Sequence, residues 1–352
     1  MPFWDIIQKS KISMTTPAAS VSPPETARLD TYIQKAWKTN EQLHPFGVAS
    51  DESAATNPAI APPTLRRGKT NRIIYYIGSF NPPHLGHQAL MDHVLEHSRH
   101  EADPDFNAVA IIAITHGERW VQRKLARESR TTPASPQGGG LHLPFDQRKA
   151  LLEQGLPASL RRRGVWVFPR PLDDWFGFLW RLMQACQDDG FALEMHELLG
   201  PDYVEWWRPQ KSGLHGVVTS DVCRAADFVV PGSPELEDMV GFAPWERVIT
   251  RDGGEGDEDG VGSSSSQGQG QEQTGELEAK KGEVWVCRES GRRSYTIRFV
   301  KCEERALDPN LSSTKLRQII AGADTDELLD KVRGAAMSPE MLVEMVRERR
   351  KN

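Results

Sequence analysis

The chain contains little cysteine, and the cysteines it has are scattered. Its 352 residues include four, Cys186, Cys223, Cys287 and Cys302, and no two of them form a C-x-x-C pair. Thiols spaced in this way argue against a disulfide framework and against a structural zinc knuckle. The composition therefore favours a protein in a reducing, intracellular environment.

Long apolar runs are also lacking. No stretch approaches the roughly 18 apolar residues that a membrane-spanning helix needs, and the first 20 residues lack the basic-then-apolar order of a secretory signal. Those residues also contain no Arg, which disfavours a mitochondrial presequence. We expect no membrane association, and a cytoplasmic or nuclear location rather than a mitochondrial one.

Positive charge is in the minority. The chain has 43 Lys and Arg against 49 Asp and Glu, which gives a formal net charge of -6 at pH 7. Such a chain has no overall attraction to the phosphates of DNA or RNA. Nucleic acid is therefore not an expected partner, and any anion site must be a local cluster of cations and N–H groups.

Two segments differ in composition from the rest of the chain. Residues 1–70 are rich in Pro, Ala, Ser and Thr, with one helix expected at about 25–42, and residues 252–282 have almost no apolar side chains. Residues 252–282 cannot offset the entropy of ordering, so we predict a disordered insertion there, and the composition of residues 1–70 indicates a largely disordered extension. The domain limits that follow are 1–70 for the extension, 71–251 with 283–322 for the main domain, 252–282 for the insertion, and 323–352 for a C-terminal helical tail.

Short apolar runs recur along the main domain. They lack polar alternation and are separated by amphipathic stretches of helical length, such as 86–98 and 146–155. Runs of this kind are typical of parallel strands covered by helices on both faces. We therefore predict an α/β fold, a Rossmann-like open and mainly parallel sheet. The expected strands include 108–115, 165–168, 192–200 and 216–221.

The decapeptide GSFNPPHLGH, residues 78–87, follows one apolar run and opens a helix. It therefore lies at the carboxyl end of a strand, where open α/β sheets bind ligands. Gly78 and Ser79 let the backbone approach a ligand closely. His84 and His87 meet at the helix start, beside free N–H groups and the positive end of the helix dipole. The pattern predicts a cradle for a phosphate.

Two other interpretations of these histidines remain open. They can serve only to cap a helix, with the glycines making a turn. Alternatively, four histidines share part of a helical face and bind zinc; they are His84, His87, His93 and His97. No cysteine or cluster of carboxylates completes such a set, so no metal site is predicted.

A second anion pattern, LSSTKLRQII, occurs far along the chain. Ser312, Ser313 and Thr314 stand at a helix start. Arg317 follows Ser313 by four residues and so lies one turn into the same helix. Hydroxyls, free N–H groups and a guanidinium then point the same way, which suits the β and γ phosphates of a nucleoside triphosphate. An ordinary helix N-cap is the alternative interpretation.

Together, the two patterns resemble a known family. GSFNPPHLGH is similar to the His-x-Gly-His signature of nucleotidyltransferases, and Ser-Thr-x-x-Arg resembles the element that ends the same superfamily domain. The Phe-Asn-Pro form of the first motif most resembles nicotinamide or nicotinate mononucleotide adenylyltransferases. The resemblance implies catalytic roles for His84, His87, Arg317 and Lys124. It implies ATP or phosphate contacts for Gly78, Ser79, Phe80, Gly86, Ser312, Ser313, Thr314 and Arg224, and acceptor or ribose contacts for Asn81, Trp175, Gly200 and Asp202.

Several of these assignments rest on elements between the two motifs. Lys124 lies in ITHGERWVQRKL, which resembles a segment in which lysines meet phosphate, and Asp202 belongs to a Gly-x-Asp element like the one that borders the ribose pocket. Trp175 lies in PLDDWFGFLW, where Phe176 replaces the Glu of the family's Trp-Glu pair. Arg148 begins a helix where the family often has Arg, and no role is assigned to it. The alternatives are a solvated basic face for Lys124, a helix cap for Asp202 and core packing for Trp175.

The resemblance implies transfer of AMP from ATP to nicotinamide or nicotinate mononucleotide, with release of pyrophosphate, as in NAD biosynthesis. The acceptor phosphate is already ionised at pH 7, so positioning and charge stabilisation are needed and a general base is not. Mg²⁺ is expected with ATP, bridging its phosphate oxygens. The alternatives are a cytidylyltransferase, a pantetheine-phosphate adenylyltransferase, and a non-catalytic nucleotide-binding or scaffold protein of this fold. A homo-oligomer is compatible with the sequence.

Overall fold

The structure is a computed structural model, and it describes most of the predicted main domain. The predicted disordered insertion 252–282 and residues 1–23 of the predicted extension lie outside the described residues. The described residues are 24–39, 41–46, 63–131, 141–204, 215–230, 232–233, 235–248, 283–291, 295–303 and 307–351.

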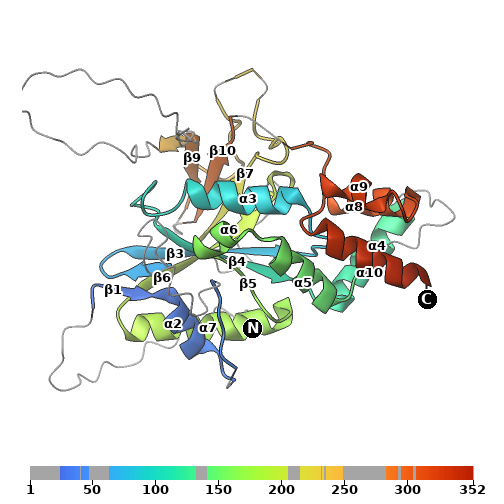
Figure 1. The fold of residues 1–352 in the computed structure, drawn as a ribbon. Helices are drawn as coiled ribbons and strands as arrows, with labels where there is room; N and C mark the ends of the chain where they lie inside the picture. Colours follow the sequence, from blue (N-terminus) through green and yellow to red (C-terminus); the bar gives the residue numbers. More distant parts are fainter. Residues whose placement is uncertain are drawn as a thin grey trace, which may run out of the picture.

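An eight-stranded sheet forms the centre of the molecule (Figure 1). Its strand order is β5-β4-β3-β6-β7-β10-β9-β8, parallel from β5 to β10 and antiparallel from β10 to β8. The predicted α/β fold with an open, mainly parallel sheet is confirmed. The strands are β3 (Thr70–Gly78), β4 (Ala108–Thr115), β5 (Val165–Val167), β6 (Ala192–Leu199), β7 (Gly216–Ser220), β8 (Glu246–Val248), β9 (Glu283–Arg288) and β10 (Thr296–Lys301).

The chain changes its direction of travel across the sheet between β3 and β6. From β3 it moves outward through β4 to β5, and α7 (Leu172–Asp188) then returns it to β6 on the other side of β3. Ligands of open α/β sheets bind beyond the carboxyl ends of the strands at such a switch point. The topology therefore predicts a ligand site beyond the carboxyl ends of β3 and β6.

Helices cover both faces of the sheet (Figure 1). On one face lie α3 (Leu85–Glu96), α5 (Phe145–Gly155) and α6 (Ala158–Arg162), and on the other lie α2 (Leu29–Ala36) and α7. Successive strand residues point to opposite faces, so neighbours such as Ile73 and Ile74 pack in different cores. Among the described residues, no helix is both long and apolar enough to cross a bilayer.

Part of the predicted extension belongs to the folded core, which corrects the domain limit at residue 70. β1 (Thr26–Arg28) pairs with β2 (Thr64–Arg66), and α2 follows β1 directly, so the helix expected at 25–42 is shorter. Leu29 and Ile33 are fully buried in the core shared with α7, because apolar residues four apart lie on one helix face. The sequence thus indicated a helix in this segment, but the average composition did not indicate that the helix packs in the core.

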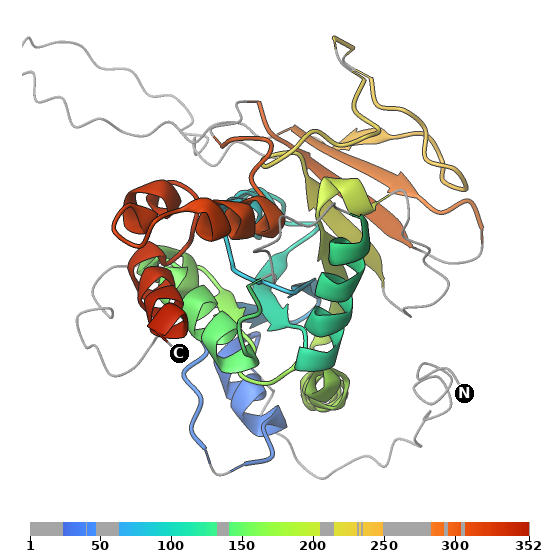
Figure 2. The ribbon, with the colours of Figure 1, turned by 90° about the vertical axis from the view of Figure 1, so that its right-hand side faces the viewer.

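The C-terminal helices form part of the domain, contrary to the predicted separate tail at 323–352. Figure 2 shows α8 (Ser313–Gly322), α9 (Leu328–Arg333) and α10 (Pro339–Lys351) gathered beside α5. The apolar face of α10 supplies a shared core, although the helix as a whole is polar. That core includes Leu151, Leu316, Ile320, Leu328, Val332, Leu342 and Val346.

The connection between α9 and α10 also holds the first motif. The N–H of Leu85 donates to the carbonyl of Ala335 at 2.9 Å, and the N–H of Met337 donates to the carbonyl of Pro83 at 3.4 Å. These bonds flank an antiparallel bridge between the two segments. The C-terminal segment thereby fixes the backbone at the point where α3 begins.

We expect Leu342→Ala to lower the free energy of unfolding by about 2–4 kcal/mol, because it removes buried methyl groups from the core of α8, α9 and α10. Urea unfolding measures the loss. Glu348→Ala, at an exposed position of the same helix, is the control. Equal stability of the two variants would contradict the placement of α10 in the core.

Candidate functional site

A cavity of about 740 Å³ lies beyond the carboxyl ends of β3, β6 and β7, at the topological switch point. We call it the switch-point cavity. Residues of both predicted phosphate motifs line it, together with segments between them. The predicted site residues in its lining are Gly78, Ser79, His84, Gly86, His87, Lys124, Gly200, Asp202, Arg224, Ser312, Ser313 and Thr314. Those outside its lining are Phe80, Asn81, Trp175 and Arg317.

The two histidines of the first motif lie at the N-terminus of α3, with ring centroids 3.7 Å apart. Nδ1 of His87 accepts a hydrogen bond from the backbone N–H of His84 at 3.1 Å, so a neutral His87 carries its proton on Nε2. Burial lowers the pKa of His84 to about 3, and burial also holds the pKa of His87 well below its ordinary value. Both rings are therefore neutral at pH 7 and act as N–H donors rather than as charges.

Glycines in this turn make room for its rings. A Cβ on Gly86 would lie 2.9 Å from Nδ1 of His84, and one on Gly78 would lie 2.6 Å from the ring of Phe80. Phe80 is fully buried, with its ring edge-on to that of His87 at a centroid distance of 5.0 Å. The apolar Phe80 ring is stabilised by packing against His87, so only the backbone of this residue is left for a phosphate contact, which stays a prediction.

Asn81 holds a neighbouring segment in place. Its side-chain amide donates to the carbonyl of Leu141 at 2.7 Å, and its side-chain oxygen accepts from the N–H of Leu143 at 2.9 Å. The side chain is buried and used by these two bonds. Asn81 thus holds backbone groups that lead into α5 and lies outside the cavity lining, and its acceptor contact stays a prediction.

Arg317 connects the two motifs. Its Nη1 donates to the carbonyl of Asn81 at 2.7 Å, and its Nη2 donates to Oγ1 of Thr314 at 3.0 Å and forms an ion pair with Glu128. Glu128 belongs to α4 (Glu118–Thr131) and lines the cavity. The guanidinium thus lies outside the cavity lining and is bonded to Thr314 and Glu128, which line it, so the direct phosphate contact of Arg317 stays a prediction.

The start of α8 completes this connection. Oγ of Ser313 donates to the carbonyl of Pro82 at 2.8 Å, across 231 residues of sequence. Oγ of Ser312 accepts from the N–H of Lys315 at 3.1 Å and so caps the helix. The N-cap interpretation and the phosphate interpretation are compatible, because the first turn of α8 still lines the cavity.

Lys124 is a cation of the cavity lining that lies next to the first motif. Its Nζ lies 3.4 Å from Oγ of Ser79 and 4.0 Å from Oε1 of Glu128. Burial lowers its pKa, and Glu128 opposes that effect. Arg123, the neighbouring residue of α4, is exposed and outside the cavity lining. Of these two basic side chains, only Lys124 lines the cavity and is in position for a phosphate contact.

Asp202 and Arg224 pair with each other at the edge of the cavity. Nη1 of Arg224 lies 2.8 Å from Oδ2 of Asp202, and both side chains are partly exposed. Asp202 is in the short helix η3 (Pro201–Tyr203) that follows β6. A ligand that uses either group must compete with this ion pair or extend it.

Trp175 corrects the predicted base-stacking site. Its side chain is fully buried, and its ring packs against Phe168, Tyr75 and Phe178 at centroid distances of 5.3, 5.9 and 5.7 Å. The register of α7 turns this Trp into the sheet and leaves Phe176 exposed. Trp175 therefore packs in the core, as the alternative interpretation has it.

An aromatic pair that the sequence analysis did not identify lines the cavity instead. The rings of His116 and Trp120 are stacked, with centroids 3.7 Å apart and planes 7° from parallel, and the Trp120 side chain is 38% exposed. Both residues lie in ITHGERW, directly after β4. His116 and Trp120 are four residues apart where a helix begins, and this spacing is the feature of the sequence that indicates that the two rings can meet.

Arg148 is a buried support of the same site. Its Nε donates to the carbonyl of Leu143, and its Nη1 donates to the carbonyls of Ser79 and His116, each bond being 2.8 to 2.9 Å long. The side chain is fully buried, with Glu118 as its partly exposed ion-pair partner. Arg148 therefore joins the segments after β3 and β4 and does not meet a ligand itself.

A resident metal site is not evident in the described part of the chain. No group of three or more His, Cys, Asp or Glu side chains there is placed to hold a metal ion. The four histidines considered as zinc ligands thus have no complete ligand set among the described residues. Carboxylates of Glu128, Glu197 and Asp202 do line the switch-point cavity.

The chain matches no protein-family model, and no curated protein is significantly similar to it. The resemblance to mononucleotide adenylyltransferases therefore rests on the motif residues and on where they lie in the fold.

We expect the free energy of unfolding to fall as the pH decreases from about 6.5 toward about 3. Burial holds the folded-state pKa of His84 at about 3 and that of His116 at about 4, whereas both titrate near 6.5 when unfolded. In that window the unfolded chain binds more protons, so acid favours unfolding by about 1.4 kcal/mol per pH unit for each such histidine. Urea unfolding across this range should show a shallower slope for His116→Asn; an unchanged slope would contradict its burial as a neutral ring.

Proposed function

We propose that the chain is a nucleotidyltransferase that transfers AMP from ATP to nicotinamide or nicotinate mononucleotide and releases pyrophosphate. The observation that carries the proposal is that GSFNPPHLGH and LSSTKLRQII, far apart in sequence, line one cavity at the switch point. The groups lining this cavity include imidazoles, hydroxyls, two cations and the N-termini of α3 and α8, which suit phosphates. The first motif follows β3 and the second opens α8, and these positions support the proposal.

The proposed reaction needs no nucleophilic side chain. An ionised phosphate oxygen of the acceptor attacks the α-phosphorus of ATP, the bond from that phosphorus to the bridging oxygen breaks, and pyrophosphate leaves with the electron pair. His87, through Nε2–H, and Lys124 stabilise the negative charge around the α-phosphorus. The N-terminus of α8 with Ser313 and Thr314 receives the β and γ phosphates. Mg²⁺ enters as the ATP complex, held by triphosphate oxygens and water.

The acceptor base is assigned to the stacked pair of His116 and Trp120. A pyridinium ring has a π face and positive charge, both of which favour contact with an exposed indole. The pair follows β4, next to β3, so it lies beside the first motif. We further infer an intracellular protein, cytoplasmic or nuclear, in keeping with its free thiols and with ATP as substrate.

Lys124→Ala and His87→Ala should each lower kcat by about a hundredfold or more, since each removes a charge-stabilising donor. ATP affinity of His87→Ala should stay within several-fold of the parent value, which also shows that the variant folds. Arg123→Ala is the matched control, because it removes a cation from the same helix outside the cavity. Pyrophosphate release measures turnover; parent-like turnover of His87→Ala would remove the mechanism.

Trp120→Ala should raise KM for the mononucleotide by about tenfold and leave KM for ATP nearly unchanged, because stacking on a base contributes about 1–3 kcal/mol. Trp180→Ala is the control, with a side chain that is 43% exposed and outside the cavity lining. Steady-state kinetics with each substrate varied in turn distinguish the two. Equal effects of the two variants on KM would argue against the assigned acceptor site.

A further inference from the structure

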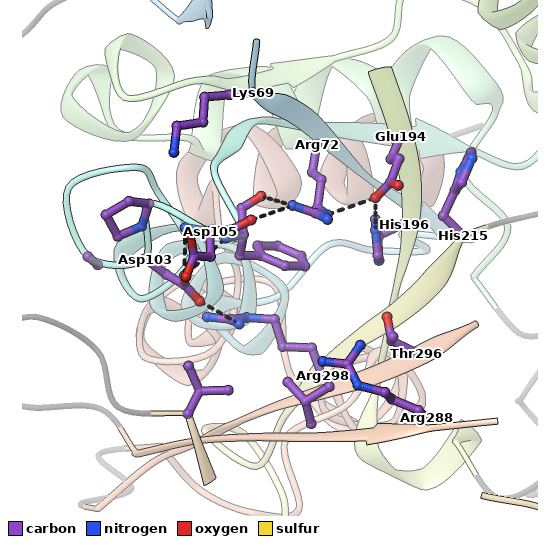
Figure 3. A pocket seen from close by; sticks show the side chains of 15 residues that line it. Lys69, Arg72, Asp103, Asp105, Glu194, His196, His215, Arg288, Thr296 and Arg298 are labelled. Atoms are coloured by element: carbon purple, nitrogen blue, oxygen red, sulfur yellow. Dashed lines mark hydrogen bonds and ion pairs between the residues drawn. The ribbon is translucent and has the colours of Figure 1, made fainter. Parts of the chain in front are cut away.

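A second cavity lies at the opposite end of the parallel strands (Figure 3). Its volume is about 490 Å³, and its lining comes mainly from the amino-terminal parts of β3, β6 and β10 and from the loop before β4. We call it the basal cavity. The proposed transfer reaction does not use it, because the switch-point cavity lies beyond the carboxyl ends of the strands.

Two arginines are held inside the basal cavity. Nε of Arg72 lies 2.9 Å from Oε2 of Glu194, and Nη1 of Arg298 lies 2.8 Å from Oδ2 of Asp103. Both guanidinium groups also contact the ring of Phe106, at 4.9 and 4.3 Å from its centroid. In Figure 3 the two arginines extend into the cavity from different strands. Each ion pair neutralises one carboxylate of the lining and fixes one cation.

Hydrogen-bonding groups nevertheless remain unused in this cavity. Nε of Arg298 and both ring nitrogens of His196 are buried without a hydrogen-bond partner among the described residues, and Nε2 of His196 is 3.6 Å from Glu194, too far for a good bond. Nδ1 of His215 accepts from the N–H of Met195 at 3.1 Å, so neutral His215 carries its proton on Nε2. Buried donors without acceptors are costly, which favours a ligand rich in acceptor oxygens.

Positive charge remains at the rim after the ion pairs are counted. Lys69 and Arg288 are exposed, line the cavity and have no ion-pair partner among the described residues. The remaining carboxylate in the lining, that of Asp105, is also exposed. Two cations against one carboxylate, next to fixed donors, attract an anion even though the whole chain is acidic.

We propose that the basal cavity binds the phosphate group of a small ligand, either free phosphate or a phosphomonoester. Phosphate oxygens accept from Nε of Arg298 and Nε2 of His215, while Arg288 and Lys69 supply charge at the open side. The volume leaves room for a small organic group beside the phosphate. This site is independent of the proposed adenylyl transfer.

Isothermal titration of the full chain with inorganic phosphate and with ribose 5-phosphate tests the proposal. Arg288→Ala should weaken binding by about tenfold, because it removes a charge-assisted contact from an exposed position. Arg247→Ala is the matched control: Arg247 precedes Val248 of the lining in β8, so its side chain points to the other face of the strand. Lys124→Ala reports phosphate bound in the switch-point cavity. Neither Arg247→Ala nor Lys124→Ala should change the binding of phosphate to the basal cavity.

The outcomes separate the alternatives. Tighter binding of ribose 5-phosphate than of inorganic phosphate supports a phosphomonoester ligand, and equal binding supports free phosphate. The proposal is overturned if neither compound binds, if only Lys124→Ala weakens binding, or if Arg288→Ala and Arg247→Ala weaken it equally. If the chain has no transferase activity but its phosphate binding depends on Arg288, the proposed function fails and the proposal for the basal cavity stands. The two proposals can therefore fail independently of each other.

Discussion

The switch-point cavity depends on the hydrogen bonds between α8 and the turn before α3. Ser313 and Arg317 donate to the carbonyls of Pro82 and Asn81, respectively. The turn contains two consecutive prolines, which have no N–H, so it cannot satisfy itself with a regular ladder and relies on donors from elsewhere. The segment between α9 and α10 supplies a second attachment, at Pro83 and Leu85. The C-terminal helices therefore place both histidines of the first motif.

Cations in and next to the switch-point cavity are paired with carboxylates. Glu128 is paired with Arg317 and lies near Lys124, and Asp202 is paired with Arg224. A bound phosphate can replace these carboxylates as the partner of Lys124 and Arg224, which line the cavity. The neutral histidines add donors without adding repulsion between cations. A chain with a net negative charge can in this way keep a local anion site.

Local patterns in the sequence predicted the sheet and the position of the first motif well, because a strand, a turn and a helix start are set by adjacent residues. Contacts over long distances in the chain could not be predicted in this way. The carbonyl that Arg317 binds is 236 residues away, and nothing near Arg317 indicates whether it faces a ligand or a backbone group. Trp175 is equally compatible with a core or a cavity until the register of α7 is known. The ion pairs of Arg72 and Arg298 combine separate strands and a loop, without any local motif.

The most direct test of the central claim is product formation by the purified full chain with MgATP and one acceptor at a time. The acceptors are nicotinamide mononucleotide, nicotinate mononucleotide and phosphopantetheine, with CTP in place of ATP as a further arm, and both pyrophosphate and the adenylylated product are quantified. The account predicts equal amounts of pyrophosphate and of a dinucleotide with a pyridine mononucleotide and ATP. Clear ATP binding without product from any acceptor, or product only with CTP or phosphopantetheine, would contradict it.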